Sequence, residues 1–185
     1  PVHPLTGPVA VEGAEPGDVL EVELLDLQHK GWGYTGFMPG EMGLGLLPED
    51  FPDAKVHVWD LQGDTGTFVN GIEVELDPFP GVIGVAPGDD GEHDTLPPYD
   101  TGGNMDVKHM TAGSTVYLPV ETEGALFSTG DCHAAQGDGE VCVTGIEAPM
   151  FVTARFNVRK DMDIEQPQLR TSGPFTPTGR DEPMY

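Results

Sequence analysis

The sequence predicts an all-β fold, a sandwich or barrel-like arrangement with long loops rich in glycine and proline and with little helix. Within residues 18–24, Leu20, Val22 and Leu24 alternate with two glutamates, which is the two-residue period of a strand with one buried face. Asn70-Gly71 stands between two further alternating runs and is typical of a tight hairpin turn. No window of a dozen residues keeps an apolar stripe at helical spacing. Strands and turns therefore account for the pattern.

The expected elements can be followed along the chain. The strand at 18–24 comes directly after turn residues, and the hairpin covers 67–75, with positive φ at its Asn-Gly turn. Further strands are expected at 82–86, which is apolar throughout, and at 115–120, 125–128, 140–146 and 150–158. Long loops are expected at 31–45 and at the acidic segment 88–100, and 46–51 can hold one helical turn.

A length of 185 residues suits one domain with one hydrophobic core, which we expect to cover residues 1–165. Residues 166–185 contain four prolines and no periodicity, so this segment is expected to be an arm or a linker.

The charge balance is strongly acidic, with 32 Asp and Glu against 8 Lys and Arg and a net charge of −24. Such a chain lacks the basic patch that nucleic acids or anionic membranes require as partners. Two interpretations are open, an ordinary acidic protein and adaptation to high salt. Because the acid is spread along the sequence, we favour the second and expect stability to rise with KCl into the molar range. Two cysteines and no signal-peptide pattern indicate a reducing, cytoplasmic location.

The segment 130–140 combines the side chains of a metal site. In an extended chain Asp131 and His133 share a face, and Asp138 and Glu140 do so after the intervening turn. Imidazole and carboxylate groups that converge in this way suit zinc or a similar divalent cation. The same spacing also fits a turn capped by Asp138 and a half-buried His133 with satisfied hydrogen bonds, so spacing alone leaves both interpretations open.

Longer motifs favour the first interpretation. The run GDCHAAQGDGE at 130–140 resembles the central motif of the acetamidase/formamidase family. Four further segments resemble that family in the same order along the chain: 3–8, 12–18, 78–87 and the run GGNMD at 102–106.

The resemblance implies an all-β fold and a bound divalent metal. It also implies hydrolysis of short amides, such as formamide or acetamide, to the carboxylate and ammonia. It also implies a homo-oligomer whose small-molecule partner is the amide. Family members extend beyond this chain at both ends, so the domain at 1–165 is expected to be an incomplete, amidase-like part of the enzyme.

Roles for individual residues follow from the reaction. Asp131, His133 and Asp106 are predicted metal ligands, and the metal can polarise the amide carbonyl or acidify a water molecule. Glu140 is either a further ligand or the general base. Glu147 follows an apolar run, and it is either a second candidate base or a solvated carboxylate at a strand edge.

The segment 103–108 supplies the remaining candidates. Gly103 allows a ligand to approach the backbone, Asn104 can hydrogen-bond the substrate amide, and Lys108 can stabilise an oxyanion if the segment is extended. A surface strand with ordinary charges explains the same residues. Cys132 is an alternative nucleophile, although strand alternation turns it away from His133.

The sequence therefore predicts metal-assisted hydrolysis of small linear amides. Two alternatives remain open: a related hydrolase that acts on a lactam or a urea-like amide, and a non-catalytic β-sandwich module that binds a metal or ligand.

Overall fold

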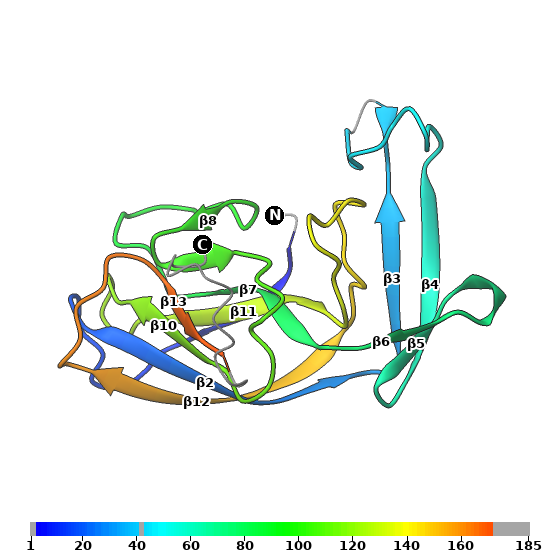
Figure 1. Cartoon of the computed structure of the whole chain (residues 1–185). Coiled ribbons are helices and arrows are strands. Elements are labelled where there is room, and N and C mark those ends of the chain that lie inside the picture. Colours follow the sequence, from blue (N-terminus) through cyan, green and yellow to red (C-terminus); the bar gives the residue numbers. More distant parts are fainter. Residues whose placement is uncertain (1–2, 41–42, 172–185) are drawn as a thin grey trace, which may run out of the picture.

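A computed structural model describes residues 3–40 and 43–171 and confirms the all-β prediction. Two sheets lie over one another as a sandwich, and a third sheet projects from one end (Figure 1). In spatial order the first contains β1 (Leu5–Val9), β11 (Phe127–His133), β7 (Phe79–Gly84), β9 (Gly102–Asn104) and β8 (Pro98–Tyr99). The second contains β12 (Met150–Arg159), β2 (Val19–His29), β10 (Thr115–Pro119) and β13 (Gln168–Arg170), and the third contains β3 (Trp32–Phe37), β4 (Lys55–Gln62), β5 (Thr65–Thr67) and β6 (Glu73–Glu75).

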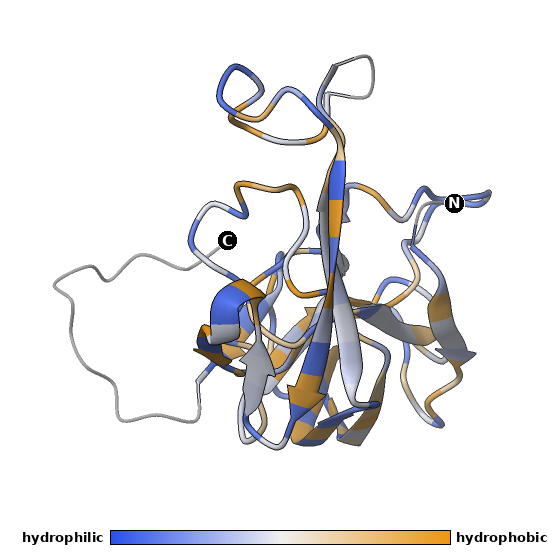
Figure 2. Ribbon diagram, turned by 90° about the vertical axis from the view of Figure 1, so that its right-hand side faces the viewer, coloured by the Kyte–Doolittle hydropathy of each residue, from blue (hydrophilic) through white to orange (hydrophobic). Residues whose placement is uncertain are grey.

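The main hydrophobic core lies between the first two sheets. Leu20, Val22 and Leu24 of β2 are fully buried and belong to the same cluster as Phe79 and Ile83 of β7. Burial of each such side chain contributes about 1.5–3 kcal/mol relative to exposure. Hydrophobic and hydrophilic residues alternate along the strands at the bottom of Figure 2, as a sheet with one packed face requires. The core therefore holds the ends of β7 and β11 in fixed positions.

A hairpin that turns at Asn70-Gly71 is confirmed, but residues 68–72 connect its strands, with a 3-10 turn at Val69–Gly71, where a two-residue loop was expected. β5 and β6 pair antiparallel, with Thr65 opposite Glu75 and Thr67 opposite Glu73. At the turn Asn70 has φ 60° and Gly71 has φ 74°, both in the left-handed region that this dipeptide tolerates.

The prediction of one long loop over 31–45 is wrong, because β3 occupies its first half. Gly33 allows this strand to pack closely: a Cβ atom there would lie 2.8 Å from the carbonyl oxygen of Glu147. Tyr34 and Glu147 exchange two backbone hydrogen bonds of 2.8 Å each. The glycines that suggested a loop instead permit two backbones to approach each other.

The strand predicted at 140–146 is also wrong. Glu140 and Val143 have φ values of 41° and 63°, and the Val143 N–H donates to the Glu140 carbonyl oxygen over 2.7 Å. A chain with these dihedral angles turns, despite its apolar residues. The segment after β11 is therefore a compact loop that returns to the end of that strand.

The segment predicted as an arm or linker contributes β13, which pairs with β10 through Leu169 opposite Val116. Residues 172–185 of that segment lie outside the described residues. In the described part of the chain, no helix has the length and apolar character needed to cross a membrane.

Candidate metal centre

The candidate site lies where β11 ends. His133 is the last residue of this strand, its side chain is only 1% exposed, and its ring packs edge-on against Phe79 with 5.0 Å between centroids. Because β11 pairs with β7 through His133 opposite Phe79, the imidazole is fixed by the core. The loops that follow β9 and β11 bring further polar groups to the same place.

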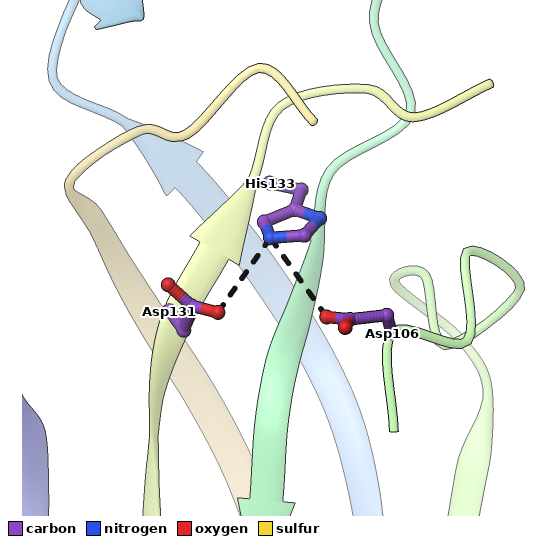
Figure 3. A group of neighbouring side chains, drawn as sticks. All are labelled: Asp106, Asp131 and His133. Carbon is purple, nitrogen blue, oxygen red and sulfur yellow. Dashed lines mark ion pairs between the residues drawn. The ribbon is translucent and has the colours of Figure 1, made fainter. Parts of the chain in front are cut away.

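Three carboxylates surround Nε2 of His133. This atom lies 3.2 Å from Glu147 Oε2, 3.7 Å from Asp131 Oδ2 and 3.9 Å from Asp106 Oδ1. Figure 3 shows Asp131 and Asp106 approaching the imidazole from two sides of the site. Glu140 belongs to the same constellation, because its carboxylate lies within 4.8 Å of ligand atoms of His133 and Glu147. Four acidic side chains thus share one histidine: Asp106 after β9, and three from the stretch that contains His133 itself.

Gln136 determines which nitrogen of His133 faces these carboxylates. Its side-chain Nε2 donates to the backbone oxygen of Asp106 over 3.0 Å, so its Oε1 must be the atom that lies 2.7 Å from His133 Nδ1. Since Oε1 can only accept, Nδ1 carries the hydrogen. In the neutral imidazole the lone pair is therefore on Nε2, which is the form that binds a metal.

The backbone is strained at three of the acidic residues. Asp106, Asp131 and Glu140 have φ values of 47°, 48° and 41°, in a region that costs non-glycine residues free energy. This conformation explains why the extended segment predicted over 103–108 is wrong: β9 ends at Asn104, and the chain then turns at Asp106. The turn directs the Asp106 carboxylate toward His133.

Gly81 of β7 leaves the space that these groups share. A Cβ atom at this position would lie 2.6 Å from Asp106 Oδ1 and 3.1 Å from His133 Nε2. Any larger residue would therefore intrude between the carboxylate and the imidazole.

Burial and mutual repulsion perturb the acidic groups. Burial raises the pKa of Asp106, and it raises the pKa of Glu140 to about 7, with the charge of Asp106 adding to the effect on Glu140. Burial also opposes ionisation of Asp131, but the nearby imidazoles of His133 and His3 together outweigh it and lower the pKa of Asp131. The site thus carries more negative charge than His133 can balance.

These residues fit a divalent cation. Asp106 Oδ1 and His133 Nε2 are both buried, and neither has a hydrogen-bond partner among the described residues. The two atoms lie 3.9 Å apart. Burying both without a hydrogen bond costs free energy unless a proton or a cation lies between them. The mixture of imidazole and carboxylate oxygen suits zinc and similar divalent metals.

The metal-free protein should lose stability at alkaline pH. Burial lowers the pKa of His133, but Asp131 and Glu147 outweigh burial and raise it from 6.5 to about 11. Because the folded-state pKa is the higher one, this stabilisation is complete below pH 6.5 and is lost as pH rises toward 11. We expect a fall of up to about 1.4 kcal/mol per pH unit.

Urea unfolding in the presence of a chelator measures this slope between about pH 7.5 and about pH 9, within the interval over which His133 loses its proton. The His133→Gln variant is the control and should show a much flatter dependence. Equal slopes in the two proteins would contradict the assignment.

Several predicted residues lie elsewhere. Lys108 Nζ pairs with Asp138 Oδ1 at 2.5 Å, and Asp138 is 90% exposed, so neither belongs to the constellation around His133. Asn104 donates through Nδ2 to the backbone oxygen of Leu96, while its Oδ1 is buried without a partner in the described residues. Gly103 lines a separate cavity of about 200 Å³ beside β7 and β8.

Glu147 is only 8% exposed, so the alternative of a solvated edge carboxylate does not fit its position. Its Oε1 accepts a hydrogen bond of 2.9 Å from the Gly145 N–H, which leaves Oε2 directed at His133. Cys132 is an unfavourable nucleophile, because burial and the charges of Asp131 and Glu147 raise the pKa of its thiol to about 12.

Sequence reasoning assigned no role to Gln136 or Gly81, although both lie in the quoted motifs. It also assigned no role to His3. The structure places His3 Nε2 3.8 Å from Asp131 Oδ2. Gln136 lies in the same motif as His133, and this closeness to a predicted metal ligand could have identified it as the hydrogen-bond partner of that ligand.

The Acetamidase/Formamidase family model matches residues 1–93 and 88–185. The chain belongs to the acetamidase/formamidase family. It is 33% identical to the acetamidase of Mycolicibacterium smegmatis and 32% identical to the formamidase of Methylophilus methylotrophus. These alignments cover the whole chain but 60% and 59% of the two relatives.

Solved structures of the family share the fold. An acetamidase from Bacillus halodurans is 42% identical with a TM-score of 0.84, over 91% of this chain and 56% of that protein. A gamma lactamase from Delftia acidovorans is 31% identical with a TM-score of 0.82, over 96% and 57%. The chain thus spans somewhat more than half the length of the relatives it matches.

Gln136 offers a further test of the centre in this family member. Gln136→Leu removes the acceptor that fixes His133 and the donor that holds the Asp106 backbone. We expect zinc affinity to fall about 10–100-fold, as is usual when a metal-binding histidine loses its partner. Competition with a chromophoric chelator measures this loss, and unchanged affinity would contradict it. Gln166→Leu is a suitable control, because Gln166 makes an exposed contact with Asp100.

Proposed function

We propose that the enzyme hydrolyses small linear amides, such as formamide and acetamide, to the carboxylate and ammonia at the centre around His133. The observation that carries this proposal is the convergence of four carboxylates on a buried imidazole whose Nε2 is free to bind a cation. The acetamidases and formamidases among its relatives support the choice of substrate. A reaction on an unactivated amide needs both an electrophilic centre and a base, and this group of residues can supply them.

His133, Asp131 and Asp106 would hold the metal, for which zinc is our preferred candidate. When bound, the metal supplies Lewis acidity toward the amide carbonyl. Gln136 orients His133, and the Gly145 N–H orients Glu147, so these groups are fixed before the substrate enters. Such preorganisation lowers the cost of reaching the transition state.

Glu140 is our candidate for proton transfer. A carboxyl group with a pKa of about 7 can accept a proton from the attacking water at neutral pH and return it to the leaving nitrogen. Glu147 is more constrained, because one of its oxygens is already engaged by the backbone. We therefore propose that Glu147 supports the cation beside His133, Asp131 and Asp106, and that Glu140 transfers the proton.

A cyclic amide is a second candidate substrate, because a gamma lactamase is among the similar structures. Release of ammonia distinguishes the two, since opening a lactam ring retains the amine in the product. A panel of formamide, acetamide and a γ-lactam therefore tests both substrates in one experiment.

The decisive assay measures ammonia from formamide and acetamide with the full-length enzyme, before and after chelation and after zinc is returned. Activity that disappears on chelation and returns with zinc supports the proposal. Activity that persists without metal would overturn the role of the cation. If the loaded protein binds zinc but cleaves none of the three amides, it is a binding module rather than an enzyme.

Three further properties are proposed with this function. The acidic composition suggests a cytoplasmic enzyme adapted to high salt, and the family resemblance suggests a homo-oligomer. A melting temperature that rises from dilute buffer to molar KCl would support the salt adaptation, and a temperature indifferent to salt would contradict it. Sedimentation of the full-length enzyme measures the oligomeric state.

A further inference from the structure

His3 lies beside the metal centre although it is far from the other ligands in sequence. β1 pairs with β11 through Leu5 opposite Gly130, which brings the residues before β1 next to the end of β11. The His3 N–H donates to Thr95 Oγ1 over 3.2 Å, so its backbone is also held by the acidic loop. Its side chain is 14% exposed. This histidine is therefore positioned by two separate segments of the fold.

A second contact with Thr95 fixes the tautomer of His3. Its Nδ1 lies 2.9 Å from the backbone oxygen of Thr95. A carbonyl oxygen can only accept, so Nδ1 must donate, and a neutral imidazole then has its lone pair on Nε2. This is the arrangement in which metal-binding histidines are commonly held, with the other ring nitrogen bonded to a backbone carbonyl.

The available Nε2 of His3 faces the centre. It lies 3.8 Å from Asp131 Oδ2, and the Nε2 of His133 lies 3.7 Å from the same oxygen. Both distances exceed that of a direct hydrogen bond. Asp131 is thus flanked by two imidazoles, each of which another residue holds in the same tautomer.

We propose that His3 is an additional cation-binding residue of this centre and acts through Nε2 alongside Asp131. The inference rests on the proposed metal-dependent function and extends it to the identity of the ion. Two imidazoles among carboxylates favour zinc and other transition metals over magnesium and calcium, which prefer oxygen ligands alone. His3 thereby contributes to metal selectivity as well as to affinity.

X-ray absorption at the zinc edge tests the proposal directly, because it counts imidazole ligands without reference to activity. We expect two imidazoles in the zinc-loaded full-length enzyme and one in His3→Gln, together with a loss of zinc affinity of at least about tenfold. The matched control is His93→Gln, because His93 is an exposed histidine of the same acidic loop and bonds only to Asp89 in the described structure. It should leave both values unchanged.

A second variant separates binding from a structural role. In His3→Ala, added imidazole should restore zinc affinity, which would not happen if His3 only held the chain in place. One imidazole in both wild type and His3→Gln would overturn the inference and leave the metal-dependent function standing. Failure of the wild-type enzyme to bind zinc would overturn both.

Discussion

Replacement of His133 by Gln is expected to abolish amide hydrolysis and to weaken zinc binding by more than about 100-fold. The loss should exceed the 10–100-fold effect typical of removing a partner of a metal ligand, because this change removes the central ligand itself. Three carboxylates converge on its Nε2 at 3.2, 3.7 and 3.9 Å. Without the imidazole, the carboxylates of Asp106, Asp131 and Glu147 lose the nitrogen on which they converge.

Ammonia release and zinc titration by calorimetry measure the two effects. His57→Gln is the matched control, since His57 Nε2 is also buried without a partner in the described residues, but its ring packs against Trp59 and Phe68. That variant should keep its zinc affinity and its activity. Retention of full activity by His133→Gln would remove the basis for placing the reaction at this centre.

Replacement of Glu140 by Gln should reduce kcat by about 10²- to 10⁴-fold, the usual range for loss of a general acid or base. The unprotonated carboxylate is the active form, so wild-type activity should rise with pH as this group ionises. Burial sets the pKa of Glu140 at about 7 in the metal-free protein. A bound cation favours the charged form and should shift this rise to lower pH.

The same variant decides between two roles of Glu140. If it transfers protons, Glu140→Gln keeps zinc affinity and loses the acidic limb of the pH profile. If it is a ligand, zinc affinity falls instead. Asp138→Asn is the control from the same loop, because Asp138 is 90% exposed and pairs with Lys108. It should change kcat little, and an equal loss in both variants would show a general effect on the loop.

The spacing of Asp131 and His133 was enough to predict that they lie on the same side of the chain, because both belong to β11, although the positive φ of Asp131 interrupts the regular strand geometry. Glu147 was recognisable as an acid after an apolar run, but its burial depends on β3 packing against it. No local pattern shows such a contact between distant segments. The same applies to His3, which reaches the centre only because β1 pairs with β11.

Errors arose where the backbone leaves the extended conformation. The apolar residues of 140–146 favoured a strand, yet turns at Glu140 and Val143 override them. Lys108 and Asn104 were grouped with Asp106 by a two-residue period that ends with β9. Sequence reasoning therefore predicted the architecture and the centre of the motif, whereas strained residues and distant contacts required the three-dimensional fold.

Gly81 is a position at which a very small substitution would block the metal centre. Because Gly81 has no side chain, space remains between Asp106 and His133. A single methyl group at this position would fill the volume that a cation needs. A Gly81→Ala protein that folds should keep the same β-sandwich but should no longer bind the metal. Natural relatives with a larger residue at this position would therefore be candidates for family members that no longer bind the metal.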